Sequence, residues 1–525
     1  MNQTIHCACP NCKVSICVAC LKLACTSSCT DSPEKCPNLH HCENSRAMLV
    51  FRLLSSLDRF YIKERASEKL KATSRTTVAK GAGIGFGSGF AGVNPNVYYQ
   101  RRQAVQSQEK PKSEAALQRD EQLKSFYRGI GWILKTGTGK GILEIMQMSV
   151  LSSAMEELLR NDSISDCSDR AVLYASFLSA LESIGLHPPL SEFYTLPREI
   201  VEYTDGLEMI MLGEGTIVKA SGEAKGVPLL DVMDNLAKSA ETFYKTANQI
   251  PGQLNIADTN VINSINLCRS ILSVRELLRR TSQSHSSSPQ VSNETYSSLC
   301  SKLAYEEFPL DVPFHFTNTA MIPAPTNPRR TLTLAKELST MATSLPPGIF
   351  IRSQQNRPDC IKALIAGPEG TPYFHGLFEF DIYASPNYPA EPPTVHFLTT
   401  AGGRVRFNPN LYAYHTPPLG DEGLIYSDGK VCLSLIGTWH GAPEEQWQPY
   451  KSTIMQILIS IQSMLLCPRP YFNEPGSGES RDTAASLAYD REVRLQTVRI
   501  AICDWMTPAN RNSIWKVFPD LFMSH

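Results

Sequence analysis

The chain has 525 residues, 42% hydrophobic and 19% charged, so most of it is able to bury apolar cores and full-length disorder is excluded. Its 50 basic and 51 acidic residues nearly cancel, and a net charge of −1 does not fit a general nucleic-acid binder. No apolar run approaches the roughly 18–20 residues of a membrane span. No secretory signal is visible either, so we expect an intracellular protein, cytoplasmic or nuclear.

Cysteines gather at the N-terminus, where nine of the sixteen fall within the first 42 residues. Without a secretion signal, such a cluster favours metal binding over a disulfide framework. The two CxxC pairs each offer two thiolates to a tetrahedral ion, which predicts zinc. The candidate ligands are Cys9, Cys12, Cys17, Cys20, Cys25, Cys29, Cys36, His41 and Cys42, enough for two four-coordinate sites. A tail of reduced thiols without metal is the alternative.

The run from Cys9 to Cys20, with the spacing C-P-x-C-x4-C-x2-C, resembles part of a RING-between-RING ubiquitin ligase. In that family a further CxxC precedes this run, and the second RING carries a catalytic cysteine just before it. Here residues 1–6 contain no cysteine. We therefore assign no ligase catalysis to this end, which we expect to form a zinc-binding segment over residues 1–45.

Residues 46–113 are expected to form a helix, from Met48 to about Leu70, and a glycine-rich linker. The linker, Gly81 to Gly92, contains one G-x-G-x-x-G, but no strand precedes it and no helix follows, so a dinucleotide site is not favoured. Thr136 to Gly141 lacks the first glycine and the hydroxyl residue of a phosphate-binding loop. It predicts a turn between two helices.

Residues 114–280 show apolar residues at helical spacing and are expected to form a helical scaffold. Residues 281–328 are rich in serine and proline, which is typical of a linker.

In residues 329–525 the spacing of apolar residues alternates between that of helices and that of strands. A helix is predicted over Arg329 to Thr343, with Arg329, Arg330 and Lys336 on its solvated face, and a buried helix over Thr453 to Leu466. Strands separated by proline turns are predicted over Ile361–Ala366, Leu377–Tyr383 and Thr394–Leu398. Short antiparallel strands covered by helices define an α+β fold.

From about residue 330 to 505, seven motifs occur in order, among them AGPEGTPYFHG, YPAEPPTVHF, RFNPNLY, GKVCLSLIGTW and PYFNEPG. Together they resemble a ubiquitin-conjugating enzyme (E2) domain, and most of all the large E2s of the BRUCE/apollon type. The resemblance implies an antiparallel four-stranded meander with flanking helices. It also implies transthiolation of ubiquitin from an E1 onto a cysteine, followed by transfer to a lysine, with ATP used by the E1 only.

The resemblance assigns roles to five residues. Cys432 matches the nucleophile, since a thioester stores an activated carboxyl that an amine attacks. The family's His-Pro-Asn appears as Asn408, Pro409 and Asn410, with Asn410 matching the residue that stabilises the oxyanion. Asn473 lies in the loop that follows the long helix and is a supporting candidate that orients or desolvates the amine.

Two departures from the family pattern concern access to the predicted active site and the recruitment of ligases. Residues 413–427 form an insertion beside the predicted active site, interpreted as a surface loop or as a feature that shapes access. Ala390 replaces a phenylalanine with which many E2s dock ligases, whereas Trp447 to Pro449 retains the second docking loop. The basic residues of the 329–343 helix are a candidate contact for the E1.

The implied partners are ubiquitin, an E1, protein substrates and possibly an E3, with no nucleic acid and no membrane. An active E2, possibly an E2/E3 hybrid, is the favoured function. A catalytically inactive E2 fold that binds ubiquitin or a ligase is one alternative. A fragment of a RING-between-RING ligase fused to an E2 is the other.

Overall fold

The computed structural model describes residues 6–8, 15–17, 43–76, 114–219, 225–248, 259–283, 300, 302–309, 311–321, 327–414, 426–439, 441–473, 483–507 and 514–515. Two compact units are present. The first contains Met1–Asn161, Asp166–Ala237 and Asn266–Pro289, and the second contains Asp162–Ser165, Lys238–Ile265 and Gln290–His525. Among the described helices, none has the length and apolarity that a membrane crossing requires.

The N-terminal end contributes two short strands, β1 (His6–Ala8) and β2 (Ser15–Cys17), which pair antiparallel with His6 opposite Cys17. Residues 9–14, which hold the first CxxC, connect these strands in sequence. Of the predicted zinc ligands, Cys17 lies in β2. The remaining eight, Cys9, Cys12, Cys20, Cys25, Cys29, Cys36, His41 and Cys42, lie outside the described residues, as does the glycine-rich stretch 81–92.

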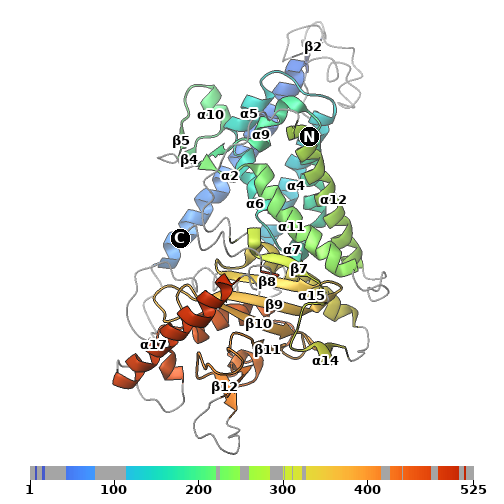
Figure 1. Cartoon of the computed structure of the whole chain (residues 1–525). Coiled ribbons are helices and arrows are strands. Elements are labelled where there is room, and N and C mark those ends of the chain that lie inside the picture. Colours follow the sequence, from blue (N-terminus) through green and yellow to red (C-terminus); the bar gives the residue numbers. More distant parts are fainter. Residues whose placement is uncertain are drawn as a thin grey trace, which may run out of the picture. The chain divides into compact units, whose positions relative to one another are not determined.

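Helices dominate the rest of the first unit (Figure 1), and α4 packs along α8 and α2. The predicted helical spacing is confirmed, and two small antiparallel sheets, β3–β6 and β4–β5, interrupt it. Helices α7, α11 and α12 have residues in both units. The elements between residues 43 and 283 are α2 (Glu43–Thr76), α4 (Glu114–Lys135), α5 (Ile142–Met148), α6 (Leu151–Leu159), α7 (Ile164–Asp169), α8 (Ala171–Gly185), η3 (Pro188–Leu190), α9 (Glu192–Thr195), β3 (Arg198–Glu199), β4 (Val201–Thr204), α10 (Leu207–Met211), β5 (Ile217–Lys219), β6 (Lys225–Gly226), α11 (Leu229–Asn248) and α12 (Thr259–Gln283).

Two polar residues of α2 fix the turns between these helices. Asp58 is fully buried and accepts hydrogen bonds from the Ser149 hydroxyl (2.6 Å) and from the Leu207 amide (2.9 Å). Arg46 donates to the Thr138 carbonyl at 3.1 Å. Thr138 belongs to the stretch between α4 and α5, so the predicted helix–helix turn at 136–141 is confirmed.

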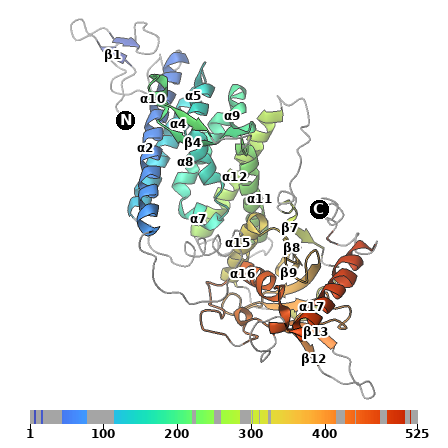
Figure 2. The same cartoon turned by 90° about the vertical axis from the view of Figure 1, so that its left-hand side faces the viewer.

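The second unit is built on a seven-stranded sheet in the order β12-β13-β11-β10-β9-β8-β7. Figure 2 labels β12 and β13 at one end of this sheet and β7, β8 and β9 toward the other. The predicted strands are confirmed, and the meander β8–β11 is antiparallel throughout, so the chain is α+β as expected. The strands are β7 (Tyr305–Phe308), β8 (Ile349–Gln354), β9 (Arg357–Ala366), β10 (Leu377–Tyr383), β11 (Thr394–Phe397), β12 (Leu411–Tyr414) and β13 (Tyr426–Val431). β7, which pairs parallel with β8, and α14 (Thr317–Ala320) lie within residues 281–328, whose composition indicated a linker.

Both predicted helices of this unit are present and begin at identifiable caps. In α15 (Pro328–Ser344) the Asn327 side chain accepts from the amides of Arg329 and Arg330. α16 (Ile454–Ser460) begins at a Thr453–Gln456 capping box and continues as the π-helical turn η5 (Ile461–Leu465). The remaining described elements are η4 (Ser434–Ile436), η6 (Pro470–Asn473), α17 (Ala484–Gln496), η7 (Thr497–Cys503) and η8 (Asp504–Met506).

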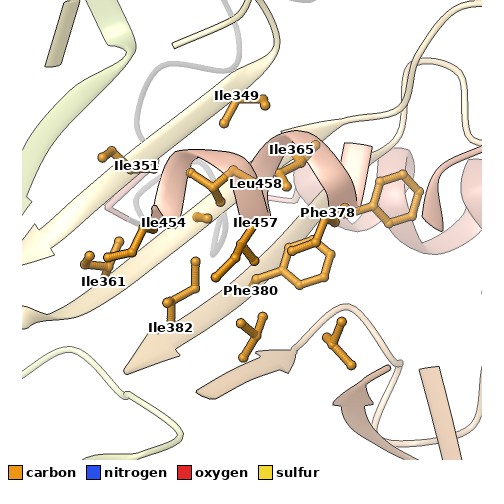
Figure 3. Packing of buried hydrophobic residues seen from close by; sticks show 14 of the residues in the cluster. Ile349, Ile351, Ile361, Ile365, Phe378, Phe380, Ile382, Ile454, Ile457 and Leu458 are labelled. Carbon is orange, nitrogen blue, oxygen red and sulfur yellow. The ribbon is translucent and has the colours of Figure 1, made fainter. Parts of the chain in front are cut away.

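One face of the sheet carries the apolar core. Alternate residues of β9 and β10 point toward α16 (Figure 3), among them Ile361 near Ile454 and Phe380 near Ile457. These side chains are at most 1% exposed. Burying a residue of this size is worth about 1.5–3 kcal/mol, so this layer fixes the helix on the sheet.

The opposite face carries charged residues that the chain itself covers. Lys362 lies 2.7 Å from the Asp381 carboxylate, and these side chains are 4% and 0% exposed. The indole of Trp515 donates to Glu379 at 3.1 Å and lies 4.9 Å from the Arg352 guanidinium. Buried charges require partners of this kind, so these contacts are needed to keep the charged side chains of this face buried.

The expectation that Arg330 lies on a solvated helix face is wrong. Its guanidinium donates to the Asp359 carboxylate at 2.8 Å and to the Ser385 carbonyl at 2.8 Å, and its side chain is 14% exposed. The residue therefore ties the start of α15 to the sheet. Arg329 is exposed and Lys336 is half-buried.

We predict that Glu337 of α15 makes the stability of this unit depend on pH. Its carboxylate accepts from the Tyr388 hydroxyl and from the Ile454 amide, and burial raises its pKa from the ordinary 4.5 to about 7. Because the folded state holds this proton more tightly, the free energy of unfolding falls as pH rises from 4.5 through about 7. The loss is about 3 kcal/mol at most.

Glu337→Gln removes this ionisation, so its unfolding free energy should change less than that of the wild type across the same pH range. Urea titrations between pH 4 and 8 measure the difference. Glu369→Gln, at an exposed position, is the matched control. Identical pH profiles for Glu337→Gln and wild type would contradict the prediction.

Candidate active site

The β12–β13 hairpin brings the two predicted catalytic residues together. Leu411 pairs with Val431, and beyond this pair the Cys432 amide donates to the Asn410 carbonyl at 2.8 Å. Cys432 is 2% exposed. The 22 positions that separate the residues in sequence are therefore spanned by one hairpin, and the two residues become neighbours.

The insertion between these residues supplies the hairpin itself. Its ends pair through Ala413 with Ser427 and Tyr414 with Tyr426, and residues 415–425 lie outside the described part of the chain. The insertion therefore extends the sheet at the edge next to the candidate nucleophile. His440, which lies eight residues beyond Cys432, is also outside the described residues.

Thr438 holds the backbone on both sides of Cys432, a role that the sequence did not reveal. Its hydroxyl donates to the Val431 carbonyl at 2.8 Å and accepts from the Leu433 amide at 3.0 Å. Gly437 adopts a φ of 69°, which a residue with a side chain rarely does, and this closes the turn. Thr438 of the GTW motif thus fixes the backbone before and after Cys432, and its two hydrogen bonds are called the Thr438 clamp below.

Asn408 lies at the centre of the hydrogen-bond network behind the site and is fully buried. Its Nδ2 donates to the Leu465 carbonyl (2.8 Å) and to the Tyr373 hydroxyl (3.4 Å). Its Oδ1 accepts from the Asn410 amide (2.8 Å) and from Asn473 Nδ2 (3.3 Å). An amide has two donors and two acceptor sites, and here all four are used.

This arrangement accounts for the departure from His-Pro-Asn. A neutral imidazole offers one donor and one acceptor, which is half of what the position requires. Tyr373 also donates to the Phe407 carbonyl at 2.7 Å, and Arg406 donates to the Pro409 carbonyl at 2.7 Å. The Asn-Pro-Asn segment is therefore held rigidly without a histidine.

Asn410 is fixed through its backbone and half-buried. Its amide donates to Asn408 and its carbonyl accepts from Cys432. Among the described residues, its side-chain amide makes no hydrogen bond. A carboxamide donor on a rigidly held backbone, in the residue next to Cys432, suits the stabilisation of a developing oxyanion.

The loop after η5 connects Asn473 to the network around Asn408. Its Nδ2 donates to the Met464 carbonyl at 2.9 Å and to Asn408, so both protons of the amide point into the protein. The Cys467 thiol lies 3.9 Å from Asn473 Oδ1, and burial raises the pKa of Cys467. Cys467 is therefore a poorer nucleophile at neutral pH than a solvated cysteine.

The two docking-loop positions lie together. The Trp447 indole donates to the Pro389 carbonyl at 3.0 Å and its ring centroid is 5.8 Å from that of Tyr388. Ala390, next to Pro389, is exposed. Within the described ranges, no group of three or more His, Cys, Asp or Glu residues is placed to hold a metal ion.

Residues 333–492 match the family model described as "ubiquitin-conjugating enzyme". Together with the sheet order and the Asn410–Cys432 pair, this match shows that the second unit contains a ubiquitin-conjugating fold.

The chain is similar to the human "Dual E2 ubiquitin-conjugating enzyme/E3 ubiquitin-protein ligase BIRC6", with 32% identity over 402 residues that cover 69% of this chain and 8% of that protein. It is 33% identical to the "Probable ubiquitin-conjugating enzyme protein 17" of Caenorhabditis elegans over 377 residues, 67% of this chain and 48% of that protein. The "Putative ubiquitin-conjugating enzyme E2 38" of Arabidopsis thaliana is 40% identical over 176 residues, 33% of this chain and 49% of that protein. This chain thus spans less than half the length of each.

We predict that Thr438 limits the exposure of the Cys432 thiol. Thr438→Val removes both hydrogen bonds of the clamp, so alkylation of Cys432 by iodoacetamide should become about tenfold faster. Thr438→Ser keeps the hydroxyl and is the control, with a rate close to wild type. Peptide mass spectrometry measures the modification at Cys432 alone. Equal rates in the valine variant and the wild type would show that Thr438 does not hold this segment.

Proposed function

We propose that the chain is a ubiquitin-conjugating enzyme that accepts ubiquitin from an E1 on Cys432 and transfers it to a lysine of a protein substrate. One observation carries the proposal. The hydrogen bond from the Cys432 amide to the Asn410 carbonyl makes these two residues neighbours within a ubiquitin-conjugating fold. A protein that only bound ubiquitin would need neither group.

In the first step the Cys432 thiolate attacks the thioester that joins the ubiquitin C-terminus to the E1 cysteine. The new C–S bond forms at Cys432, the E1 sulfur leaves as a thiolate, and the acyl group is conserved. No nucleotide takes part in this exchange, since ATP is consumed earlier by the E1. The Thr438 clamp keeps the backbone around the sulfur fixed during the step.

In the second step a substrate amine attacks the same carbonyl. The C–N bond forms, the carbonyl oxygen becomes an oxyanion, and collapse of this intermediate expels Cys432 while the amine loses a proton to solvent. Asn410 is the side chain that donates to the oxyanion. One such donor is typically worth about 10²–10³ in rate.

The first unit, which is mainly helical and is called the helical unit here, supports a broader proposal, that the chain works as an E2/E3 hybrid. Residues 333–525 are little more than a third of the chain, so the match over 69% of it to a protein named as a dual E2/E3 includes residues before the conjugating fold. The plant relative matches over 33% of the chain only. We propose that the helical unit selects protein substrates and that a separate E3 is an optional partner.

Zinc at the N-terminus belongs to the same proposal. The antiparallel pairing of β1 with β2 places Ala8 opposite Ser15, which flank the first CxxC pair in the sequence, and a set of thiolates suits a tetrahedral ion. Cys9, Cys12, Cys17 and Cys20 would hold one ion, which supplies structure rather than reactivity. Zinc content by mass spectrometry should fall in Cys12→Ser and stay unchanged in Cys300→Ser.

We place the protein in the cytoplasm or nucleus, where these thiols stay reduced.

The test is a charging assay with the purified chain, E1, ATP and ubiquitin, resolved on a non-reducing gel. The wild type should form an adduct that thiol reagents remove. Cys432→Ala should form none, and Cys432→Ser should form an ester that thiols do not cleave. Cys503→Ala, at an exposed cysteine outside the site, is the matched control and should charge normally.

Two outcomes separate the proposal from its alternatives. A wild-type chain that never charges, yet binds ubiquitin in solution, would establish the non-catalytic binding protein instead. Charging that persists in Cys432→Ala would place the nucleophile at another cysteine, as a RING-between-RING ligase with its own catalytic cysteine requires.

A further inference from the structure

Asn473 is connected to Asn410 through a single oxygen atom. The Oδ1 of Asn408 accepts from Asn473 Nδ2 at 3.3 Å and from the Asn410 amide at 2.8 Å. The two donors approach the two lone pairs of one carbonyl group, which is the full acceptor capacity of an amide oxygen. A change at Asn473 therefore alters the hydrogen bonding that fixes the backbone of Asn410.

The same residue also anchors the loop that follows η5. Its second Nδ2 proton is donated to the Met464 carbonyl at 2.9 Å, and its Oδ1 lies 3.9 Å from the Cys467 thiol. Every polar atom of the Asn473 side chain thus has a partner inside the protein. Both Nδ2 protons are therefore committed to groups behind the site, and the only contact that Oδ1 makes among the described residues is the one to the Cys467 thiol.

Asn408 itself is held from the other side by fixed groups. Its Nδ2 donates to the Leu465 carbonyl at the end of η5 and to the Tyr373 hydroxyl, which is buried. Asn408 is fully buried, so water cannot replace a lost partner. Removing the Asn473 donor leaves the Asn408 oxygen with a single partner and frees the loop that covers it.

We propose that Asn473 is a positioning residue, which sets the orientation of Asn410 by way of Asn408 and does not touch the attacking amine. The inference rests on the proposed function, because it concerns the step in which Asn410 stabilises the oxyanion. It differs from the direct role that the sequence suggested for Asn473, that of orienting or desolvating the amine.

The experiment follows single-turnover discharge of the pre-charged chain onto free lysine. Asn473→Ala and the near-isosteric Asn473→Asp both remove the donors to Asn408 and Met464, and each should discharge about tenfold more slowly. Neither should prevent charging by the E1. Asn318→Ala, at an exposed position in α14, is the control and should discharge at the wild-type rate.

Two further readouts distinguish positioning from contact with the amine. In an Asn410→Ala background, Asn473→Ala should cause no further loss, because its effect passes through Asn410. The midpoint of the pH–rate profile, which reports the ionisation of the attacking amine, should be the same in wild type and Asn473→Ala.

Independent, multiplicative losses in the double variant, or a shifted midpoint, would overturn the inference while leaving the E2 function intact. A wild-type chain that does not charge would instead overturn the proposed function, and the inference with it. Thermal melting of both Asn473 variants identifies a loss that comes from unfolding. If Asn473→Ala unfolds, Asn473→Asp, which keeps the side-chain volume, decides the question.

Discussion

The buried amide of Asn408 is the interaction on which the candidate active site depends. It joins four parts of the second unit: the Tyr373 loop between β9 and β10, the end of η5 at Leu465, the Asn473 loop, and the backbone of Asn410. In a fully buried position each of these hydrogen bonds is costly to lose, because water does not replace it. Four fixed bonds on one planar group determine where Asn410 lies relative to Cys432.

The rest of the second unit makes that arrangement rigid. The apolar face of the sheet packs against α15 and α16, and the charged face is covered by residues that include Phe314 and Trp515. On that face, Lys362 and Asp381 form a buried pair that requires its partners to remain in place. Both faces of the sheet are thus covered. Asn410 and Cys432 lie at the edge of the sheet that β12 forms.

The sequence predicted what depends on local pattern or on a shared motif. Alternation marked β10, helical spacing marked α15 and α16, and the motifs singled out Cys432 and Asn410, whose backbones the structure joins by a hydrogen bond. It did not predict contacts between side chains far apart in the chain. Asn408 reaches Leu465 across 57 positions, and Glu337 reaches Ile454 across 117. Periodicity and propensity carry no information about which distant carbonyl a buried amide will meet.

Two errors have the same origin. Arg330 looked solvated because charged residues on a helix usually face water, yet a buried Asp359 lies within its reach. The strand β7 lies in a segment whose composition is typical of a linker, and its pairing with β8 stabilises it there. In both cases a tertiary partner overrides the local preference.

The central role of this amide is tested most directly by the Asn408→Leu variant, in which a side chain of the same branched shape makes none of the four hydrogen bonds, and by the rate at which its charged thioester discharges. We expect the variant to accept ubiquitin on Cys432 yet to transfer it to lysine about 10²-fold more slowly, as if Asn410 were absent. Transfer at the wild-type rate by a folded Asn408→Leu chain would contradict the role of Asn408 as the element that positions Asn410.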